Sequence, residues 1–467
     1  MDAGVVIERA DLGRSATLDI RIARAPGGDR VIDAVGAGIR RPGDEVVDAA
    51  GAAVIPAFTD HHLHLHAMAA VSTSVHCGPP TVTDRTALAT ALHTAPAGPD
   101  GWVRGVGYVE SVAGDLTTTE LDRIEPGRPV RIQHRSGALW MLNTAALRAA
   151  GIVAGSHPGV EVDAEGLPTG RVWRADDWLR WRLPRSGPPD LTDVGRRLHD
   201  LGIVESTDAT PDLDEHRLGA LIRAVDDGLV TGRLHLLGVP VGRRLDHPRI
   251  TVGPYKIVIA DSDLPDLDDL VARIAAAHAD HRSVAVHCVS RVAFALLLAA
   301  WEIAGVRPGD RIEHAGMVPA EGGELLARLG VVVVTQPGFL PHRGDDFLDG
   351  TPQAEHADLY RCGSLIRAGV PVALSSDAPY GPLDPWQTIA AATERRTASG
   401  RVVGDTGERI GVAQAVAAHC TPAARPDGPP RRVQVGDPGD LLILDRPWAD
   451  VVAAPGDVRV DRVTATR

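Results

Sequence analysis

The sequence predicts an α/β protein built on a (β/α)8 TIM barrel, and three observations support this prediction. Short apolar runs alternate with helical segments through the middle of the chain, which is typical of parallel βαβ units. Eight such runs are found, the number of strands that a (β/α)8 barrel requires. Both ends of the chain carry short alternating runs bounded by Gly, Pro and Asp, which predict a small sheet domain formed by the two termini.

The terminal domain is expected to begin with strands at 18–23, 30–36 and 45–51. Short alternating runs of the same kind are also found at 431–445 and 458–465. Because two β-rich ends flank a longer middle, we expect the two ends to pair with each other. Residues 1–56 and 404–467 would form this domain, and residues 57–403 the barrel.

The expected barrel strands are short and apolar, and turn residues bound most of them. They lie at 52–58, 202–209, 234–240, 255–260, 283–288, 311–315, 331–337 and 371–377. Residues 267–279 and 292–305 have the apolar spacing of crossover helices. This alternation of strand and helix favours a parallel sheet.

The gap between the first and second barrel strands, about residues 67–201, is too long for one crossover. We therefore expect an inserted subdomain at the mouth of the barrel. It is rich in tryptophan, and we expect half or more of these side chains in its core rather than against a substrate: Trp102, Trp140, Trp173, Trp178 and Trp181.

Charge and composition exclude several classes of function. The formal net charge of −13 disfavours nucleic acids and anionic membrane surfaces as partners. The longest apolar runs, such as 292–301, are about half the length of a membrane-spanning helix. No secretory signal is found at the N-terminus, so a cytoplasmic location is expected. The four cysteines are isolated, which predicts reduced, packed thiols.

Metal-ligand residues gather at the ends of the expected strands. The segment Asp60-His61-His62-Leu63-His64 follows the first strand. In an extended segment, residues two apart point the same way, so His62 and His64 can reach one ion. The neighbouring His61 and His66 leave the register open from spacing alone.

Further candidates lie on other expected strands. Lys256 is on the fourth strand, and His287, His314 and Asp377 end the fifth, sixth and eighth. The carboxyl ends of barrel strands converge on one mouth, where the active site lies. We therefore expect these side chains to share one metal site with His62 and His64. Imidazole and carboxylate ligands favour zinc, with manganese, iron or nickel as alternatives.

Lys256 is the only lysine among 48 lysine and arginine residues. Arginine keeps its proton, whereas lysine can lose it and act as a nucleophile. A neutral amine can capture carbon dioxide and become a carbamate, which suits two ions about 3.5–4 Å apart. A Schiff-base lyase is disfavoured, because that chemistry needs an apolar pocket rather than a cluster of histidines.

Several segments resemble the amidohydrolase superfamily and, within it, the YtcJ-like branch. They cover nearly the whole chain and include VIPAFTDHHLHLH (54–66), GPYKIVIADSD (253–263), GDRIEHAGMVP (309–319), SSDAPYGPLDPW (375–386) and VQVGDPGDLLILD (433–445). The resemblance is specific for the family and says little about the substrate.

The resemblance implies a role for each candidate residue. His62 and His64 would bind the more buried metal, with Asp377 as a further ligand. Lys256 would be the bridging, carbamylated ligand, and His287 and His314 would hold the second metal. It also implies that the domain formed by the termini is a β-sandwich.

The function expected from these residues is a metal-dependent amidohydrolase with two zinc ions. A metal-activated hydroxide would cleave a non-peptide C–N bond of a small molecule, and Asp377 would act as base and then acid. Two alternatives stay open. A mononuclear deaminase is disfavoured because Ser290 stands where such sites often place glutamate. A non-catalytic interaction scaffold would be expected to have lost ligands. A homodimer is the candidate assembly.

Overall fold

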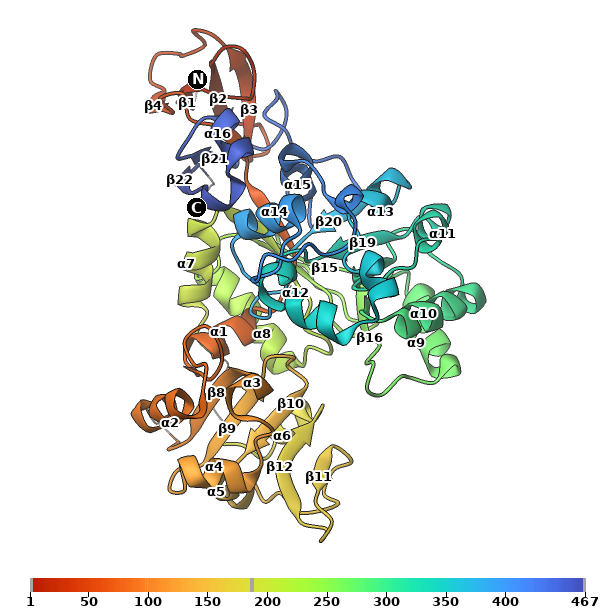
Figure 1. Cartoon of the computed structure of the whole chain (residues 1–467). Coiled ribbons are helices and arrows are strands. Elements are labelled where there is room, and N and C mark those ends of the chain that lie inside the picture. Colours follow the sequence, from red (N-terminus) through yellow and green to blue (C-terminus); the bar gives the residue numbers. More distant parts are fainter. Residues whose placement is uncertain (1–2, 97, 99, 185–188, 465–467) are drawn as a thin grey trace. The chain divides into compact units, whose positions relative to one another are not determined.

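The computed structural model describes residues 3–96, 98, 100–184 and 189–464. It divides the chain into two compact units, Met1–Leu65 with Leu191–Arg467 and His66–Asp190. Figure 1 shows the first unit in red at its start and in green to blue for the rest, and the second in orange to yellow. The first unit contains every residue predicted to form the site.

A four-stranded and a five-stranded sheet of the first unit are parallel throughout, in the orders β15-β14-β13-β6 and β16-β17-β18-β19-β20. Their strands are β6 (Phe58–Leu63), β13 (Ile203–Asp208), β14 (Arg233–Leu236), β15 (Ile250–Val252), β16 (Tyr255–Val258), β17 (Val284–Cys288), β18 (Arg311–His314), β19 (Val332–Thr335) and β20 (Val372–Leu374). From β13 onward, each expected barrel strand overlaps an observed strand. Strands β6, β13, β18 and β19 are buried along their whole length, as strands covered on both faces are.

The two sheets meet at both edges. On one side, only Gly253 and Pro254 separate β15 from β16, and the Lys256 amide donates to the carbonyl of Leu237 at 3.2 Å. On the other side, the Asp377 amide donates to the carbonyl of His62 at 2.8 Å. The strands therefore form a ring, and the residues after β20 lie beside β6.

The first expected strand, at 52–58, is wrong as a single element. Residues Val54–Pro56 form β5, which pairs with the C-terminal strand β21 (Leu441–Leu444) in another sheet. The parallel strand β6 begins at Phe58, whose amide donates to the carbonyl of Gly202 at 2.9 Å. Pro56 ends β5, and its ring nitrogen has no amide hydrogen to continue a ladder. Asp60–His62 consequently lie inside the first parallel strand rather than after it.

Most helices of the first unit lie between its parallel strands in the chain, and two lie between β20 and β21 (Figure 1). They are α7 (Thr192–Asp200), α8 (Glu215–Asp226), α9 (Leu267–Ala279), α10 (Arg291–Ala304), α11 (Gly322–Leu329), α12 (Phe339–Gly350), α13 (Gly363–Arg367), α14 (Pro385–Glu394) and α15 (Val412–Ala418), with 3-10 turns at Gln353–Asp358 and Thr406–Glu408. The predicted crossover helices correspond to α9 and α10. Side chains of Asp266 and Ser290 accept hydrogen bonds from the first turns of these helices, which fixes where each begins.

Two small sheets formed by the two ends of the chain share one apolar core. One sheet contains β1 (Val5–Ala10), β2 (Leu18–Arg24), β3 (Arg30–Gly36) and β4 (Glu45–Asp48), and the other contains β5, β21 and β22 (Val460–Val463). Ile7, Ile20 and Ile22 from the first sheet pack in the same buried cluster as Leu441 and Ile443 from the second. Helix α16 (Trp448–Ala453) and the turn Pro455–Asp457 lie between β21 and β22 in the chain.

The second unit is built on a six-stranded mixed sheet, in the order β11-β12-β10-β9-β8-β7. Its strands are β7 (Val75–His76), β8 (Val103–Tyr108), β9 (Val130–His134), β10 (Leu139–Leu142), β11 (Val160–Val162) and β12 (Pro168–Trp173). Its helices are α1 (Leu65–Ser72), α2 (Arg85–Thr94), α3 (Glu110–Ala113), α4 (Thr118–Ile124), α5 (Thr144–Ala149) and α6 (Asp176–Arg180). Trp102 and Trp140 are buried in its core, whereas Trp173 and Trp181 are exposed.

The inserted segment ends earlier than expected. The prediction extended it to residue 201, but the second unit ends at Asp190. Helix α7 (Thr192–Asp200) instead packs on β13 and β22 and belongs to the first unit. Its apolar face is covered there, with Val194 and Leu198 buried.

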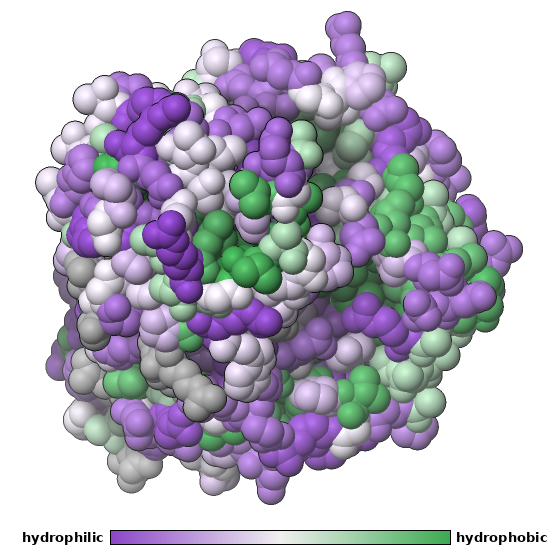
Figure 2. Space-filling view, turned by 90° about the horizontal axis from the view of Figure 1, so that it is seen from below, coloured by the Kyte–Doolittle hydropathy of each residue, from purple (hydrophilic) through white to green (hydrophobic). Residues whose placement is uncertain are grey.

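Among the described residues, no helix is long and apolar enough to cross a membrane. Hydrophilic residues cover most of the face shown in Figure 2, and the hydrophobic residues on it form separate groups. Cys77, Cys288, Cys362 and Cys420 are buried free thiols, as expected for cysteines packed as small apolar side chains.

Candidate metal centre

Strand β6 and the residue directly after it present two histidines to one site. His62 and His64 are two residues apart, and their ring centroids are 5.3 Å apart. His61 makes a different contact, since its Nε2 lies 2.9 Å from the Thr421 hydroxyl. The structure therefore groups His62 with His64, and it gives His61 a different partner.

Asp377 completes a group of three possible ligands. Its Oδ1 lies 3.2 Å from His64 Nε2 and 3.6 Å from His62 Nε2. One ligand atom from each of the three residues lies within 4.8 Å of the others. Asp377 follows β20 and has a φ of +51°, a left-handed conformation that is unfavourable for most residues but tolerated by aspartate.

Asp60 ties the two ligand-bearing segments together. Its Oδ1 accepts hydrogen bonds from the amide of His62 at 3.1 Å and from the amide of Ser376 at 3.2 Å. Burial raises the pKa of the Asp60 carboxyl to about 6. Because it joins β6 to the segment that carries Asp377, Asp60 helps to set the spacing of the ligands.

His314 and His287 come from the carboxyl ends of β18 and β17. The His314 ring lies 4.8 Å from that of His62 and 4.5 Å from that of His287, measured between centroids. His314 Nδ1 is 2.8 Å from Gln336 Oε1 and 3.8 Å from Asp377 Oδ2. The five predicted carboxylate and imidazole residues thus form one connected group.

Lys256 is buried on β16, beside β17. Its Nζ has no hydrogen-bond partner among the described residues. Burial lowers the pKa of the Lys256 amine to about 8, although the carboxylates of Glu313 and Asp377 act in the opposite direction. At neutral pH, the fraction of the Lys256 amine in its neutral form is therefore much larger than for an exposed lysine.

Burial also favours the neutral form of His62 and His314. It holds the pKa values of His62 and His314 well below the ordinary range, and neighbouring cationic groups add to the effect. A neutral imidazole offers one ring nitrogen as a lone-pair donor. His62 and His314 can therefore act as ligands without first losing a proton at neutral pH.

Sequence reasoning named Asp60 without giving it a role, and it missed three further polar residues around this group: Arg311, Glu313 and Gln336. A signal for two of them was present, because Arg311 and Glu313 are two residues apart on a strand and so face the same side. Ser290, used above to disfavour a deaminase, caps α10 by accepting from the Ala293 amide at 3.1 Å. That role gives Ser290 a structural reason to stand after His287.

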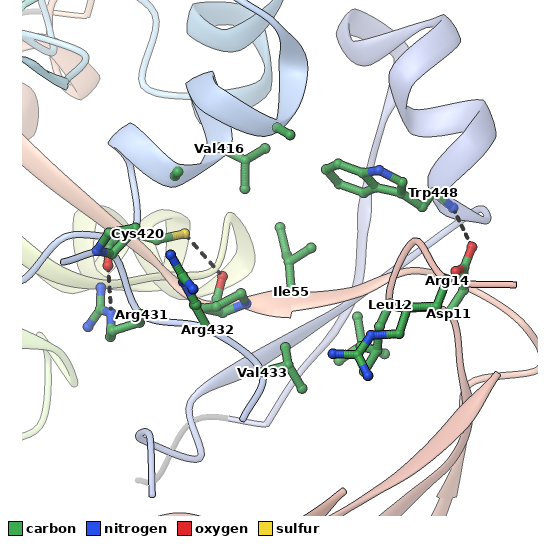
Figure 3. A pocket seen from close by; sticks show the side chains of 15 residues that line it. Asp11, Leu12, Arg14, Ile55, Val416, Cys420, Arg431, Arg432, Val433 and Trp448 are labelled. Carbon is green, nitrogen blue, oxygen red and sulfur yellow. Dashed lines mark hydrogen bonds between the residues drawn. The ribbon is translucent and has the colours of Figure 1, made fainter. Parts of the chain in front are cut away.

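A second hollow in the first unit is not this site. It has a volume of about 320 Å³ and lies between α15, β5 and the loop after β1 (Figure 3). Ile55, Val416 and Trp448 supply apolar lining, and the Trp448 amide donates to Asp11 at 2.8 Å. The residues predicted to bind metal do not line it.

Three buried ligand atoms of the site have no hydrogen-bond partner among the described residues: His62 Nε2, Asp377 Oδ1 and Lys256 Nζ. Buried polar atoms are nearly always paired, so such a group needs an explanation. Imidazole nitrogen and carboxylate oxygen are donors that suit a divalent metal ion. The donor set therefore fits a metal.

Comparison with known proteins supplies the family. The model of the amidohydrolase family matches residues 45–202 and 208–466. The N-substituted formamide deformylase of Arthrobacter pascens is 25% identical over 489 residues, covering 88% of this chain and 86% of the relative. The putative amidohydrolase YtcJ of Bacillus subtilis (strain 168) is 27% identical over 394 residues, covering 74% of each.

A solved structure shares the fold. An uncharacterized metal-dependent hydrolase from Pyrococcus horikoshii OT3 superposes with a TM-score of 0.74 and 19% identity, covering 98% of each chain. Fold and site together define an α/β protein with a group of possible metal ligands beside its parallel strands. The chain belongs to the amidohydrolase family, in its YtcJ-like branch. It is a hydrolase acting on carbon–nitrogen bonds other than peptide bonds.

Proposed function

We propose that this protein is a metal-dependent amidohydrolase that cleaves an amide-like C–N bond in a small molecule. The observation that carries the proposal is the grouping of ligand atoms of His62, His64 and Asp377 within 4.8 Å of one another. Beside it, His62 Nε2, Asp377 Oδ1 and Lys256 Nζ are buried without a hydrogen-bond partner among the described residues. Leaving such atoms unpaired is costly, and a bound cation would offset that cost.

We propose that the ring of parallel strands is a (β/α)8 barrel over residues 57–403, with a β-sandwich from residues 1–56 and 404–467. Support comes from the parallel order of the strands, from the contact of β20 with β6 and from the core shared by both chain ends. In such a barrel the ligands at strand ends share one mouth.

The proposed ligands divide into two sets. His62, His64 and Asp377 would hold one divalent ion, and His287 and His314 a second. Lys256, as a carbamate, would bridge the two ions. Zinc suits this mixture of nitrogen and oxygen donors, and manganese, iron and nickel accept the same donors.

Bound metal would polarise the substrate carbonyl and lower the pKa of a water molecule. Asp377 is the proposed proton carrier, because its carboxylate is buried and lies beside both His62 and His64. It would take a proton from the attacking water and deliver it to the leaving nitrogen.

The wall beside His64 suggests how the rest of the substrate is held. The Tyr380 ring lies edge-on to His64 with centroids 5.6 Å apart, and it packs on a buried cluster containing Phe339 and Tyr360. An aromatic wall favours a substrate with an apolar group next to the amide. The N-substituted formamide deformylase relative suggests formamides as the first substrates to test.

The test combines metal analysis with a hydrolysis screen of N-formyl, N-acyl and cyclic amides. His62→Ala and His64→Ala should lose bound metal and lose activity on the order of 100-fold or more, since each removes a ligand rather than a supporting group. His93→Ala, at an exposed histidine of α2, is the control and should change neither. Full activity in either ligand variant would refute the proposal. Hydrolysis of amino heterocycles with release of ammonia, without hydrolysis of amides, would favour a deaminase. A protein that binds no metal and hydrolyses none of these compounds would favour a non-catalytic scaffold.

A further inference from the structure

Strand β18 carries a buried ion pair next to the site. Arg311 Nε donates to Glu313 Oε1 at 2.5 Å, and the two side chains are 1% and 0% exposed. Arg311 also donates to the carbonyl of His61 at 3.3 Å, which connects the pair to β6. Glu313 is therefore held from one side by a guanidinium and cannot rotate freely.

The other oxygen of Glu313 faces His62. Glu313 Oε2 lies within hydrogen-bond distance of His62 Nδ1. The opposite ring nitrogen, Nε2, lies 3.6 Å from Asp377 Oδ1 and has no hydrogen-bond partner among the described residues. The two nitrogens of one ring thus meet different surroundings.

These contacts determine which nitrogen carries the hydrogen. An ionised carboxylate can only accept hydrogen bonds, and a neutral imidazole has one N–H. A hydrogen bond to Glu313 therefore places that hydrogen on Nδ1 and leaves the lone pair on Nε2. Carboxylates that hold metal-binding histidines in this way orient the ring and increase its basicity.

Backbone geometry explains how neighbours on one strand can both reach His62. Adjacent residues of a regular strand point to opposite faces. His314 has a φ of +72° and Ala315 a φ of +48°, so the strand turns into the left-handed region directly after Glu313. This turn brings the His314 ring to 4.8 Å from His62 while Glu313 contacts the same ring.

We propose that Glu313, anchored by Arg311, is a positioning residue that fixes His62 as its Nδ1–H tautomer and aims Nε2 at the metal. The link to metal rests on the proposed function, whereas the tautomer can be measured without metal. Arg311 contributes by holding one carboxylate oxygen of Glu313 and by connecting the pair to the His61 carbonyl.

Glu313→Gln tests the metal-binding consequence, because the amide keeps the size of the side chain and accepts hydrogen bonds more weakly. The dissociation constant for Co²⁺ or Zn²⁺, measured by competition with a chelator, should rise about 10- to 100-fold. The matched control is Glu205→Gln. Glu205 is also buried on a parallel strand and paired with an arginine, Arg431, at 3.1 Å. The metal affinity of Glu205→Gln should match that of the wild type. An unchanged metal affinity in Glu313→Gln would overturn the proposal.

Nitrogen NMR of metal-free protein labelled with ¹⁵N-histidine gives a readout that a general loss of stability would not produce. The His62 signals are assigned by their disappearance in His62→Gln. The wild type should show hydrogen on Nδ1, and Glu313→Gln a mixture of tautomers. Hydrogen on Nε2 in the wild type would overturn the positioning role. A wild-type protein that binds no metal but shows the Nδ1–H tautomer would contradict the proposed function alone.

Discussion

At the scale of the residue, burial decides the chemistry of Lys256. Its amine is enclosed on β16, and this lowers its pKa to about 8. Carbon dioxide reacts only with the neutral amine and forms a carbamate with release of one proton. Arginine stays charged in proteins and has no such reaction. Lys256 Nζ, which has no hydrogen-bond partner among the described residues, therefore meets the chemical requirement of the proposed carbamate.

Lys256→Arg should abolish the binding of two metals and reduce activity on the order of 100-fold or more, since it places a permanent cation where the bridging carboxylate is proposed. Lys256→Ala should also be inactive, but short carboxylates such as acetate or propionate should restore part of its activity. Metal stoichiometry and kcat/KM are the measurements. Two bound metals with full activity in Lys256→Arg would rule out the bridging role.

At the scale of the element, helix α10 supports the end of β17 from which His287 projects. Ser290 caps the helix, and its buried residues recur along one face: Ala293, Phe294, Leu297, Ala300 and Trp301. This face packs against α9 and β17 in a buried apolar cluster of the first unit. Packing of the helix therefore fixes the loop between His287 and Ser290.

Leu297→Ala should lower the free energy of unfolding by about 2–5 kcal/mol, because Leu297 is fully buried and its truncation leaves a cavity. Val292→Ala is the comparison on the same helix. Val292 is 60% exposed, so its truncation should cost about 0.5 kcal/mol or less. Equilibrium urea denaturation measures both values. Equal effects of the two changes would show that α10 does not pack as described.

At the scale of the whole molecule, buried neutral histidines link stability to pH. Burial lowers the pKa of His235 to about 3 and that of His419 to about 4. An unfolded histidine has a pKa of about 6.5. Below that value, the unfolded chain takes up protons that the folded protein does not bind, which stabilises the unfolded state.

The free energy of unfolding should therefore fall as the pH falls from about 6.5 towards 4, by up to about 3 kcal/mol for each histidine. Above pH ~6.5 both states are neutral at these positions and the contribution is constant. Asp60 acts in the opposite sense, since its pKa is raised to about 6. Comparison with His235→Gln isolates the histidine, and urea denaturation at several pH values should show a shallower decline in that variant. The same decline in both proteins would exclude His235 as its source.

Local pattern predicted much of the site. Alternation along a strand was enough to pair His62 with His64, and the structure places their ligand atoms near that of Asp377. Local pattern failed where the answer depended on a distant partner. The run 52–58 is apolar throughout. Its first part pairs with β21 and its last residue with β13, and only these pairings show that the run belongs to two sheets. Glu313 was missed because its contact with His62 joins strands far apart in the chain.

The core shared by the two chain ends has a consequence for the order in which the protein can fold during synthesis. Strands β1–β4 leave the ribosome well before Leu441 and Ile443, which complete their apolar cluster. Nascent chains therefore carry Ile7, Ile20 and Ile22 without their final covering while the rest of the protein is made. The sheet of β1–β4 can therefore complete its apolar core only after β21 has been made.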